Sequence, residues 1–473
     1  MPDSQNGVTA GTPSLQGASP ELLGILYVWS VALEPLLFFI VADRAFTGVM
    51  FSLSRLLQAF VVCGLCYRIV ARLITQGTIG RPWARGDGWS LYSSFWLYFG
   101  LAVVAGAIGV LSGAYRVSDD YGLDSPNSGF ARLLNSDSAR PVFEYLVALY
   151  YFFYFVVLAP VLLRTRAELR YMFDVFAALF LISFVAGMID LASGLLYNVE
   201  WLPRSLADGR IIGGRFHGLA GEPRTAFVYL FLGWAILNLR AVFLGRSLHR
   251  WCAPLIIVAA ILAESTSGLI GLACFAFLFV VYSLFRLSSR RVVELAVVVT
   301  VIAVTLTMTM ATSRRTQVYL EASSSAWAAL EAGQPLPSPL NLQQDNIYPL
   351  YDLINKVRQF DLLPVLIGSG FGSASAATNR ISAGVENEMI NPNAQIVRSL
   401  YESGLIGTLL FVLLFAHPVQ QVTRHLTAPE RDRFMVMVLL LVGCALGTRS
   451  SAPFIYAGLV VAAFCVMRPA SAE

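Results

Sequence analysis

The pattern of apolar and polar positions divides the chain into long apolar runs separated by polar connections. A helix that crosses a bilayer needs about 20 mostly apolar residues, and runs of this kind recur along the sequence. The runs that begin at Cys252 and Phe434 are short and are expected to extend further. We predict about twelve transmembrane helices, near Leu22–Ala42, Gly48–Val70, Trp89–Leu111, Pro141–Leu163, Met172–Tyr197, Thr225–Phe243, Cys252–Ala263, Leu269–Leu284, Val292–Met310, Leu400–Pro418, Phe434–Leu446 and Ala452–Met467.

Arginine-rich connections orient these helices in the membrane. Loops on the cytoplasmic side carry the excess of basic residues. Placing the alternate short, basic connections in the cytoplasm puts both termini inside and every long connection on the other face. These connections hold Arg68, Arg72, Arg81 and Arg85; Arg164, Arg166 and Arg170; Arg240, Arg246 and Arg250; Arg286, Arg290 and Arg291; and Arg424, Arg431 and Arg433.

The predicted topology divides the chain into five parts. Residues 1–20 are rich in Ser, Gly and Pro and are expected to form a disordered cytoplasmic tail. Residues 21–310 would hold the first group of helices, with outer loops at 114–140 and 198–224. Residues 311–395 would form a large outer loop, 396–468 the last helices, and 469–473 a second cytoplasmic tail.

The composition supports a membrane protein and excludes a soluble globular domain. The chain is 57% hydrophobic and 13% charged, whereas soluble domains carry about 25% charged residues. Its net charge of +4 rests almost wholly on arginine, since Lys356 is the only lysine. The planar arginine fork suits phosphate and carboxylate groups, although a general compositional bias is the simpler explanation. The six cysteines all fall in apolar stretches, so no disulfide framework is expected.

The large outer loop contains two local patterns. Apolar residues at Leu350, Leu353, Ile354 and Val357 recur at helical spacing with charged residues opposite, which predicts an amphipathic helix against the membrane or the bundle. The stretch Leu366–Ser373 is rich in glycine and predicts a flexible turn.

The first candidate site lies in Gly209–Phe227, where the 198–224 loop meets the next predicted helix. Pro223 suits the first turn of that helix, and a carboxylate just before it suits the positive helix end. The arginines could hold a diphosphate while a carboxylate or histidine takes a proton. The alternative is structural, with a helix cap and headgroup anchors. The residues concerned are Arg210, Arg215, His217, Glu222 and Arg224.

The second candidate site lies in Asn391–Phe411. Arg398 and Glu402 are four residues apart, so they can pair within one helix. A simple ion pair and a ligand-binding role for Arg398 both remain open. Arg449 is a further candidate phosphate contact, and Glu34 could be either functional or a polar contact within the bundle.

Several of these motifs, in their order along the chain, resemble the O-antigen ligase and O-antigen polymerase superfamily. The ligase motif is His, then Asn, Ser or Gln, then nine residues, then Gly-x-x-Gly. Its spacing is matched, but its histidine is replaced by Asn393 and its small polar residue by Ala394. In Glu264–Leu272 the arginine that is usual in the family is replaced by Gly268. The matching positions are Gly404 and Gly407 in the ligase motif, and Arg215, Phe216, Gly218, Glu222 and Pro223 in an Arg-Phe-x-Gly…Glu-Pro signature.

The resemblance implies an all-α polytopic membrane protein of about twelve transmembrane helices, similar to C-type membrane glycosyltransferases, with amphipathic helices in a large periplasmic loop. It further implies an enzyme of the bacterial inner membrane that acts on the periplasmic face. The donor would be a glycan on undecaprenyl diphosphate, and the acceptor another lipid-linked repeat unit. Because Asn393 can bind a sugar but cannot take a proton, the base would be Glu222, with His217 second. Diphosphate contacts would come from Arg210, Arg215, Arg224, Arg398 and Arg449.

Two other functions are compatible with this interpretation. A ligase would transfer the glycan from undecaprenyl diphosphate to lipid A-core, and it differs only in the acceptor. A transporter or flippase of lipid-linked glycan would be expected to show internal repeats, and none is found. Membrane lipids and a chain-length regulator are the other expected partners. No motif for a metal, a nucleotide or nucleic acid is present, so no cofactor is expected.

Overall fold

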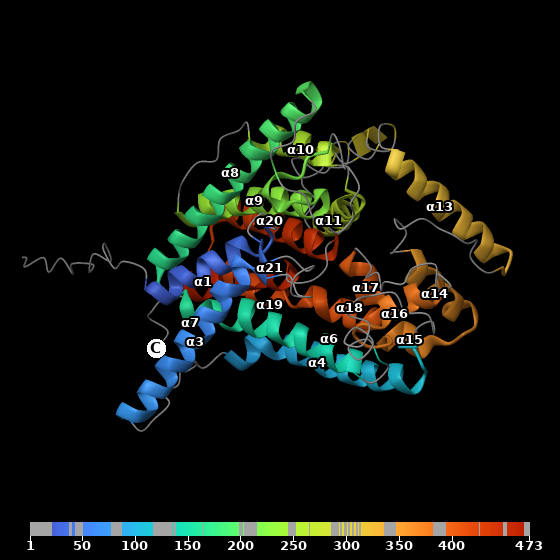
Figure 1. Cartoon of the computed structure of the whole chain (residues 1–473), viewed down its shortest axis with the longest axis horizontal. Coiled ribbons are helices and arrows are strands. Elements are labelled where there is room, and N and C mark those ends of the chain that lie inside the picture. The colour runs from blue at the N-terminus through green and yellow to red at the C-terminus, as the bar shows by residue number, and fades with distance from the viewer. Residues whose placement is uncertain are drawn as a thin grey trace, which may run out of the picture.

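The computed structural model describes residues 21–36, 40–42, 51–76, 88–116, 136, 139–163, 165–197, 202, 215–244, 252–263, 265–284, 314–334, 347–381, 394–424, 426–447 and 452–467, with isolated residues between 293 and 311. Within these ranges nearly all residues are helical (Figure 1). The exception is a short antiparallel pair of strands, β1 (Ile40–Ala42) and β2 (Phe51–Ser52).

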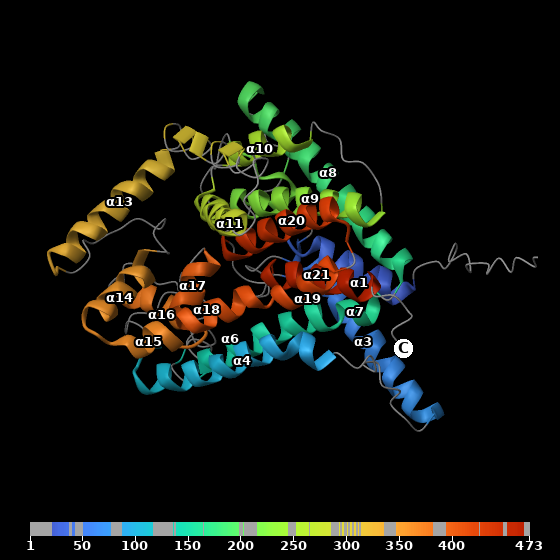
Figure 2. The ribbon, with the colours of Figure 1, turned by 180° about the vertical axis from the view of Figure 1, so that it is seen from behind.

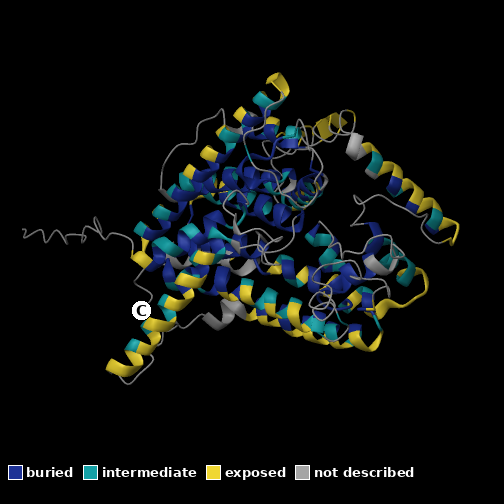
Figure 3. Ribbon diagram, in the orientation of Figure 1, coloured by how far each residue is buried: buried dark blue, intermediate teal, exposed yellow. Residues whose placement is uncertain are grey.

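The described part contains six helical stretches that are long and apolar enough to cross a membrane. The chain is therefore a helical membrane protein. Many large apolar side chains on these helices are exposed (Figure 3), as expected for surfaces that face lipid. The stretches are Leu53–Thr75 in α3 (Leu53–Gln76), Ser93–Leu111 in α4 (Gly88–Leu111), Ala139–Leu162 across α6, η2 and α7, Arg166–Tyr197 in α8, Thr225–Val242 in α9 (Pro223–Leu244) and Ser267–Leu284 in α11 (Thr266–Leu284).

Helix α20 (Ala428–Gly447) lies at the centre of the bundle, in contact with α9, α11 and α21 (Ala452–Met467). Its close approach to α11 depends on small residues. A Cβ at Gly447 would lie 2.6 Å from the Cα of Gly271, and a Cβ at Gly443 would lie 2.7 Å from the backbone of Phe275. Small residues at such interfaces let membrane helices pack backbone against backbone.

The predicted span Pro141–Leu163 is helical throughout, but its turns are not uniform. It consists of α6 (Ala139–Tyr151), a π-helical segment η2 (Phe152–Val157) and α7 (Ala159–Leu162). The carbonyl of Phe155 in the π segment accepts a hydrogen bond of 3.2 Å from the Tyr27 hydroxyl. The same oxygen would lie 1.9 Å from a Cβ at residue 458, so only Gly458 permits this contact with α21.

Two predicted spans are interrupted. The run Leu22–Ala42 forms only a 12-residue helix, α1 (Leu22–Leu33), because Pro35 has no N–H to continue it and its ring clashes with the preceding turn. The run Leu400–Pro418 is divided among α17 (Gln395–Glu402), α18 (Gly404–Leu413) and α19 (Ala416–Thr423). The break after α17 occurs at Gly404, whose φ of +67° is a conformation that other residues rarely adopt.

The long 311–395 segment contains helices wherever it is described: α13 (Arg314–Glu331), α14 (Ile347–Arg358), α15 (Leu362–Ile367) and α16 (Ser373–Ile381). The predicted amphipathic helix is confirmed as α14. Its Leu353 packs against Ala374, Ala377 and Tyr401, so the helix lies against neighbouring protein. Both views of the ribbon show α14, α15, α16 and α17 grouped at one end of the molecule (Figures 1 and 2).

The glycine-rich turn differs from the prediction because it is packed rather than flexible. Residues 368–378 are all buried. Gly368, Gly370 and Gly372 have φ of +94°, +87° and +84°, which places all three in the left-handed region. A Cβ at Gly370 would lie 2.2 Å from the Tyr115 hydroxyl and 2.5 Å from the Cα of Gly106. Glycine is therefore needed here for close packing as well as for backbone conformation.

Candidate functional site

Of the first candidate segment, Gly209–Phe227, the structure describes the part from Arg215 onward, which forms a compact turn before α9. The amide of Phe216 donates a 2.9 Å hydrogen bond to the carbonyl of Leu262, which fixes the segment to the end of α10 (Cys252–Ala263). A 3₁₀ turn follows, η4 (Gly218–Ala220), and contacts α8 and α9. Gly218 in this turn and Gly221 directly after it have φ of +51° and +71°.

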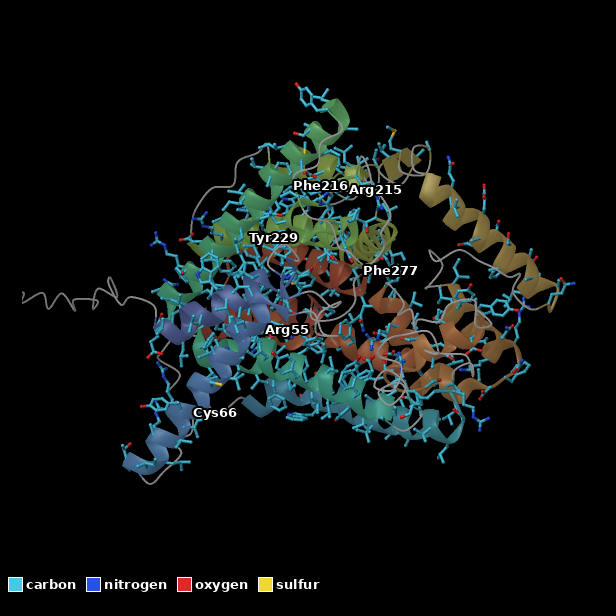
Figure 4. The ribbon with its side chains drawn as sticks, viewed as in Figure 1. Arg55, Cys66, Arg215, Phe216, Tyr229 and Phe277 are labelled. Atoms are coloured by element: carbon cyan, nitrogen blue, oxygen red, sulfur yellow. The ribbon has the colours of Figure 1, made fainter. Side chains whose placement is uncertain are left out.

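Arg215 is oriented by a backbone carbonyl. Its Nε and Nη2 donate hydrogen bonds of 3.2 and 2.9 Å to the carbonyl of Ala263, at the end of α10. This contact holds the guanidinium in a fixed orientation at the end of α10. Figure 4 shows Arg215 next to Phe216. Arg215 remains half-buried. An arginine placed in this way is suited to an anionic ligand.

Glu222 occupies the position just before α9, and Pro223 is the first residue of that helix, as the sequence predicts. Glu222 is half-buried, and its carbonyl accepts the first helical hydrogen bond, 2.9 Å from the amide of Ala226. The positive end of the helix dipole favours a carboxylate at this place. This position is compatible with both open interpretations, a helix cap and a functional carboxylate.

His217 lies deeper than a solvent-accessible base. It is 2% exposed, and its Nε2 lies 3.2 Å from Oδ2 of Asp190, which is itself buried in α8. The second oxygen of Asp190 accepts a 2.8 Å hydrogen bond from the amide of Leu202. The His217–Asp190 contact therefore joins the turn to α8, and a purely structural role explains it.

The glycine at position 268 has a physical reason in this chain. A Cβ at Gly268 would lie 2.3 Å from two ring atoms of Phe227. Phe227 belongs to α9 and is fully buried. The aromatic ring thus fills the space next to the start of α11, and a larger residue at 268 would have to displace it.

The second candidate segment contains an ionic network around Arg398. Its Nε donates a 2.8 Å hydrogen bond to Glu402, which confirms the pairing predicted from their spacing. Its Nη2 donates a 2.9 Å hydrogen bond to Glu144 of α6, 254 positions away in the sequence. The Glu402 side chain is 2% exposed and that of Arg398 14%. Burial lowers the pKa of Arg398, and the two carboxylates raise it. The net change is a rise, so the guanidinium stays charged.

The packed glycine turn is part of this network. Glu402 Oε1 accepts a 2.8 Å hydrogen bond from the amide of Gly372, and the Gly372 carbonyl accepts a 2.8 Å hydrogen bond from Nε of Arg140. Both carboxylates of the network, those of Glu402 and Glu144, contact Arg398, which the sequence predicts as a diphosphate contact. These contacts use two of the five N–H donors of the guanidinium and hold α17 against α6. The role of Arg398 as a diphosphate contact stays a prediction.

A third polar network, which the sequence does not single out as a site, joins α1, α3 and α6. Nη2 of Arg55 lies 2.7 Å from Oε1 of Glu34 and donates a 3.1 Å hydrogen bond to the Tyr151 hydroxyl. The guanidinium also lies over the rings of Tyr150 and Tyr151, 5.8 and 5.3 Å from their centroids. Figure 4 shows Arg55 in the middle of the molecule. Its partner Glu34 precedes it by 21 positions, so no helical spacing could reveal the pair.

The other predicted site residues cannot be compared with the structure. Arg210, Asn393 and Arg449 lie outside the described residues, and of Arg224 only the backbone, within α9, is described. The turn with Arg215 leads into α9, and both α9 and α17, which carries Arg398, contact α20. Among the residues that the structure describes, no group of three or more His, Cys, Asp or Glu side chains lies close enough to hold a metal ion.

The fold and these networks define a helical membrane protein with charged side chains held inside its bundle. Comparison of the sequence with models of known protein families and with curated proteins gives no match.

Proposed function

We propose that the protein is a membrane glycosyltransferase that polymerises oligosaccharide repeat units carried on undecaprenyl diphosphate. In this proposal the chain has twelve transmembrane helices in the bacterial inner membrane, both termini are cytoplasmic, and the reaction takes place on the periplasmic face. The observation that supports the proposal is that one turn carries both an oriented cation and a carboxylate. Arg215 is held by the Ala263 carbonyl, and Glu222 stands at the start of α9.

The turn is suited to this reaction because its two charged residues have separate tasks. The acceptor hydroxyl attacks the anomeric carbon of the donor sugar, and the bond from that carbon to the diphosphate oxygen breaks. Glu222 takes the proton of the hydroxyl. The electron pair leaves with the diphosphate, whose growing charge Arg215 stabilises. Arg210, Arg224, Arg398 and Arg449 remain predicted contacts of the diphosphate, and Asn393 a predicted contact of the sugar.

The first test uses purified protein with a repeat unit on undecaprenyl diphosphate as both donor and acceptor. We expect Glu222→Gln to reduce polymer formation by about 10²–10⁴-fold, the usual contribution of a general base. Arg215→Lys should also be damaging, because a point charge replaces the planar fork. The controls are Glu321→Gln on the exposed face of α13 and Arg68→Lys in an exposed pair on α3. Normal activity of Glu222→Gln would remove Glu222 as the base.

A second test distinguishes polymerase from ligase in a deletion strain. Lipid capped by a single repeat would indicate loss of a polymerase, whereas uncapped core with accumulated polymer would indicate loss of a ligase.

A transporter is the second candidate function. The observation that favours it is the Glu34–Arg55 pair, because charge inside a membrane bundle often marks a substrate path. Failure of the deletion strain to deliver lipid-linked repeat units to the outer face would support transport and contradict the polymerase.

A further inference from the structure

The short helix α15 and the residue Phe360 just before it expose an unusual amount of apolar surface. Leu362, Leu363 and Leu366 are 48, 50 and 42% exposed, and Phe360 is 85% exposed. Phe360 also has a φ of +58°, the only positive φ at a non-glycine position among the described residues. Large apolar side chains grouped in this way mark a surface that another apolar phase or partner covers.

This surface is continuous with the lipid-facing sides of two apolar helices. α15 contacts both α4 and α18. On α4, a candidate membrane span, Val103, Val104 and Leu111 are 53, 50 and 88% exposed. On α18, Leu405 and Leu409 are 56 and 59% exposed. The exposed leucines of α15 therefore extend a surface that already requires hydrocarbon around it.

The contact with α4 also fixes the depth of α15. A Cβ at Gly109 would lie 2.0 Å from the carbonyl oxygen of Ser369, so the chain just after α15 touches the last turns of the Ser93–Leu111 span. α15 thus lies beside the end of that span, at the level of one leaflet. The sequence alone places this segment in a large outer loop.

We propose that Phe360 and α15 form a re-entrant element immersed in the hydrocarbon of the leaflet at the C-terminal end of α4, with lipid acyl chains as the occupant of this surface. Helical hydrogen bonds and the amide-to-carbonyl contact from Gly368 to Pro364 satisfy backbone groups in the C-terminal part of α15, where lipid could not. The inference does not depend on the proposed enzymatic activity.

The position of α15 gives the element a role. It leads directly into the packed turn whose Gly372 amide binds Glu402 and whose Gly372 carbonyl binds Arg140. Anchoring α15 in lipid would therefore hold this turn, and with it the Arg398 network, at a fixed depth.

Thiol accessibility tests the proposal in nanodiscs that hold one copy of the full chain. Leu363→Cys and Phe360→Cys are treated with a water-soluble maleimide, and the tags added beyond the parent protein are counted by mass. We expect the thiols at both positions to react at least about tenfold more slowly than that of Ala328→Cys on the exposed face of α13. Apolar surroundings disfavour the thiolate, which is the reactive form. Val103→Cys, on the exposed side of the α4 span, supplies the lipid-facing reference.

The remaining outcomes decide the proposal in the same experiment. Reaction of both new thiols as fast as Ala328→Cys would show that water covers α15 and would overturn it. Slow reaction only in discs that contain two copies would show that a second chain covers the surface, which also contradicts a lipid occupant. Full reaction of all positions after denaturation in detergent confirms that each thiol is present.

Discussion

Glu34 and Arg55 form a 2.7 Å ion pair that joins the end of α1 to the start of α3. The Glu34 carboxylate also accepts hydrogen bonds of 2.6 Å from Ser54 and 2.7 Å from Gln58. Its side chain is 7% exposed, while that of Arg55 is 30% exposed. A carboxylate removed from water in this way depends on its partners, and so does the guanidinium beside it.

Glu34→Gln is therefore expected to destabilise the protein by about 3 kcal/mol, the lower end of the range for breaking a buried ion pair, because Arg55 keeps some access to solvent. The measurement is the thermal unfolding midpoint of the purified protein. The double variant Glu34→Gln/Arg55→Gln should lose less than the two single variants together. The exposed pair of Arg68 and Glu21, 2.9 Å apart, is the control, and Glu21→Gln should change stability by less than about 1 kcal/mol.

The Arg398 network predicts that Arg398 and Glu402 depend on each other. The Glu402 side chain is 2% exposed and lies 2.8 Å from Nε of Arg398. Arg398→Gln removes the charge that faces both Glu402 and Glu144, so it should lower stability by about 3–5 kcal/mol. The double variant Arg398→Gln/Glu402→Gln should lose less than the two single variants together. Additive losses, measured as unfolding midpoints, would contradict this account.

The glycine turn predicts different costs at two glycines that share a left-handed conformation. Gly333 has a φ of +64° and nothing within 4 Å of the position that a methyl group would take, so Gly333→Ala should cost about 1 kcal/mol of backbone strain. Gly370→Ala carries the same strain and also meets Tyr115 and Gly106, which adds about 1–3 kcal/mol of overpacking. Comparing the two unfolding midpoints separates packing from conformation. Equal losses would show that the contact with Tyr115 relaxes freely.

His217 and Glu222 can be distinguished by activity per folded protein. His217 is enclosed with Asp190, so His217→Gln is expected to lower the unfolding midpoint but to leave glycosyl transfer within about tenfold of wild type, well short of the loss of a general base. Glu222→Gln should instead lose about 10²–10⁴-fold with an unfolding midpoint close to the wild-type value. The assay is polymer formation, corrected for the fraction of folded protein. The opposite pattern would assign the base to His217.

The sequence predicts the helices better than it predicts their breaks and contacts. The apolar runs behind α8, α9 and α11 indicate the right elements because each is an apolar run long enough to cross a bilayer. The ends of α1 and α17 depend on single residues, Pro35 and Gly404. Hydrophobicity averaged over an apolar run does not reveal the effect of one such residue. The prediction of twelve spans remains a prediction, since six helical stretches meet the criteria for a span within the described residues.

The contacts of site residues could be predicted only where the partner residue lies near in the sequence. Arg398 and Glu402 lie on one helix face, and their pairing follows from a spacing of four. Glu144 joins them from another helix, and Asp190 meets His217 from outside the turn, so only the packing of the bundle reveals these contacts. The same limit hides Arg55 as a partner of Glu34.

Two of the three polar networks meet along α6, which carries Arg140 and Glu144 of one and Tyr150 and Tyr151 of the other. The wide π-helical turn follows directly at Phe152–Val157. A π turn holds one residue more than the α-helical turn it replaces. Deleting one residue would therefore restore an ordinary helical turn with little change in the alignment of α6 and α7, but it would shift the Phe155 carbonyl that meets Tyr27 and Gly458. The extra residue thus serves the contacts of this segment with α1 and α21, while the direction of the helix does not depend on it.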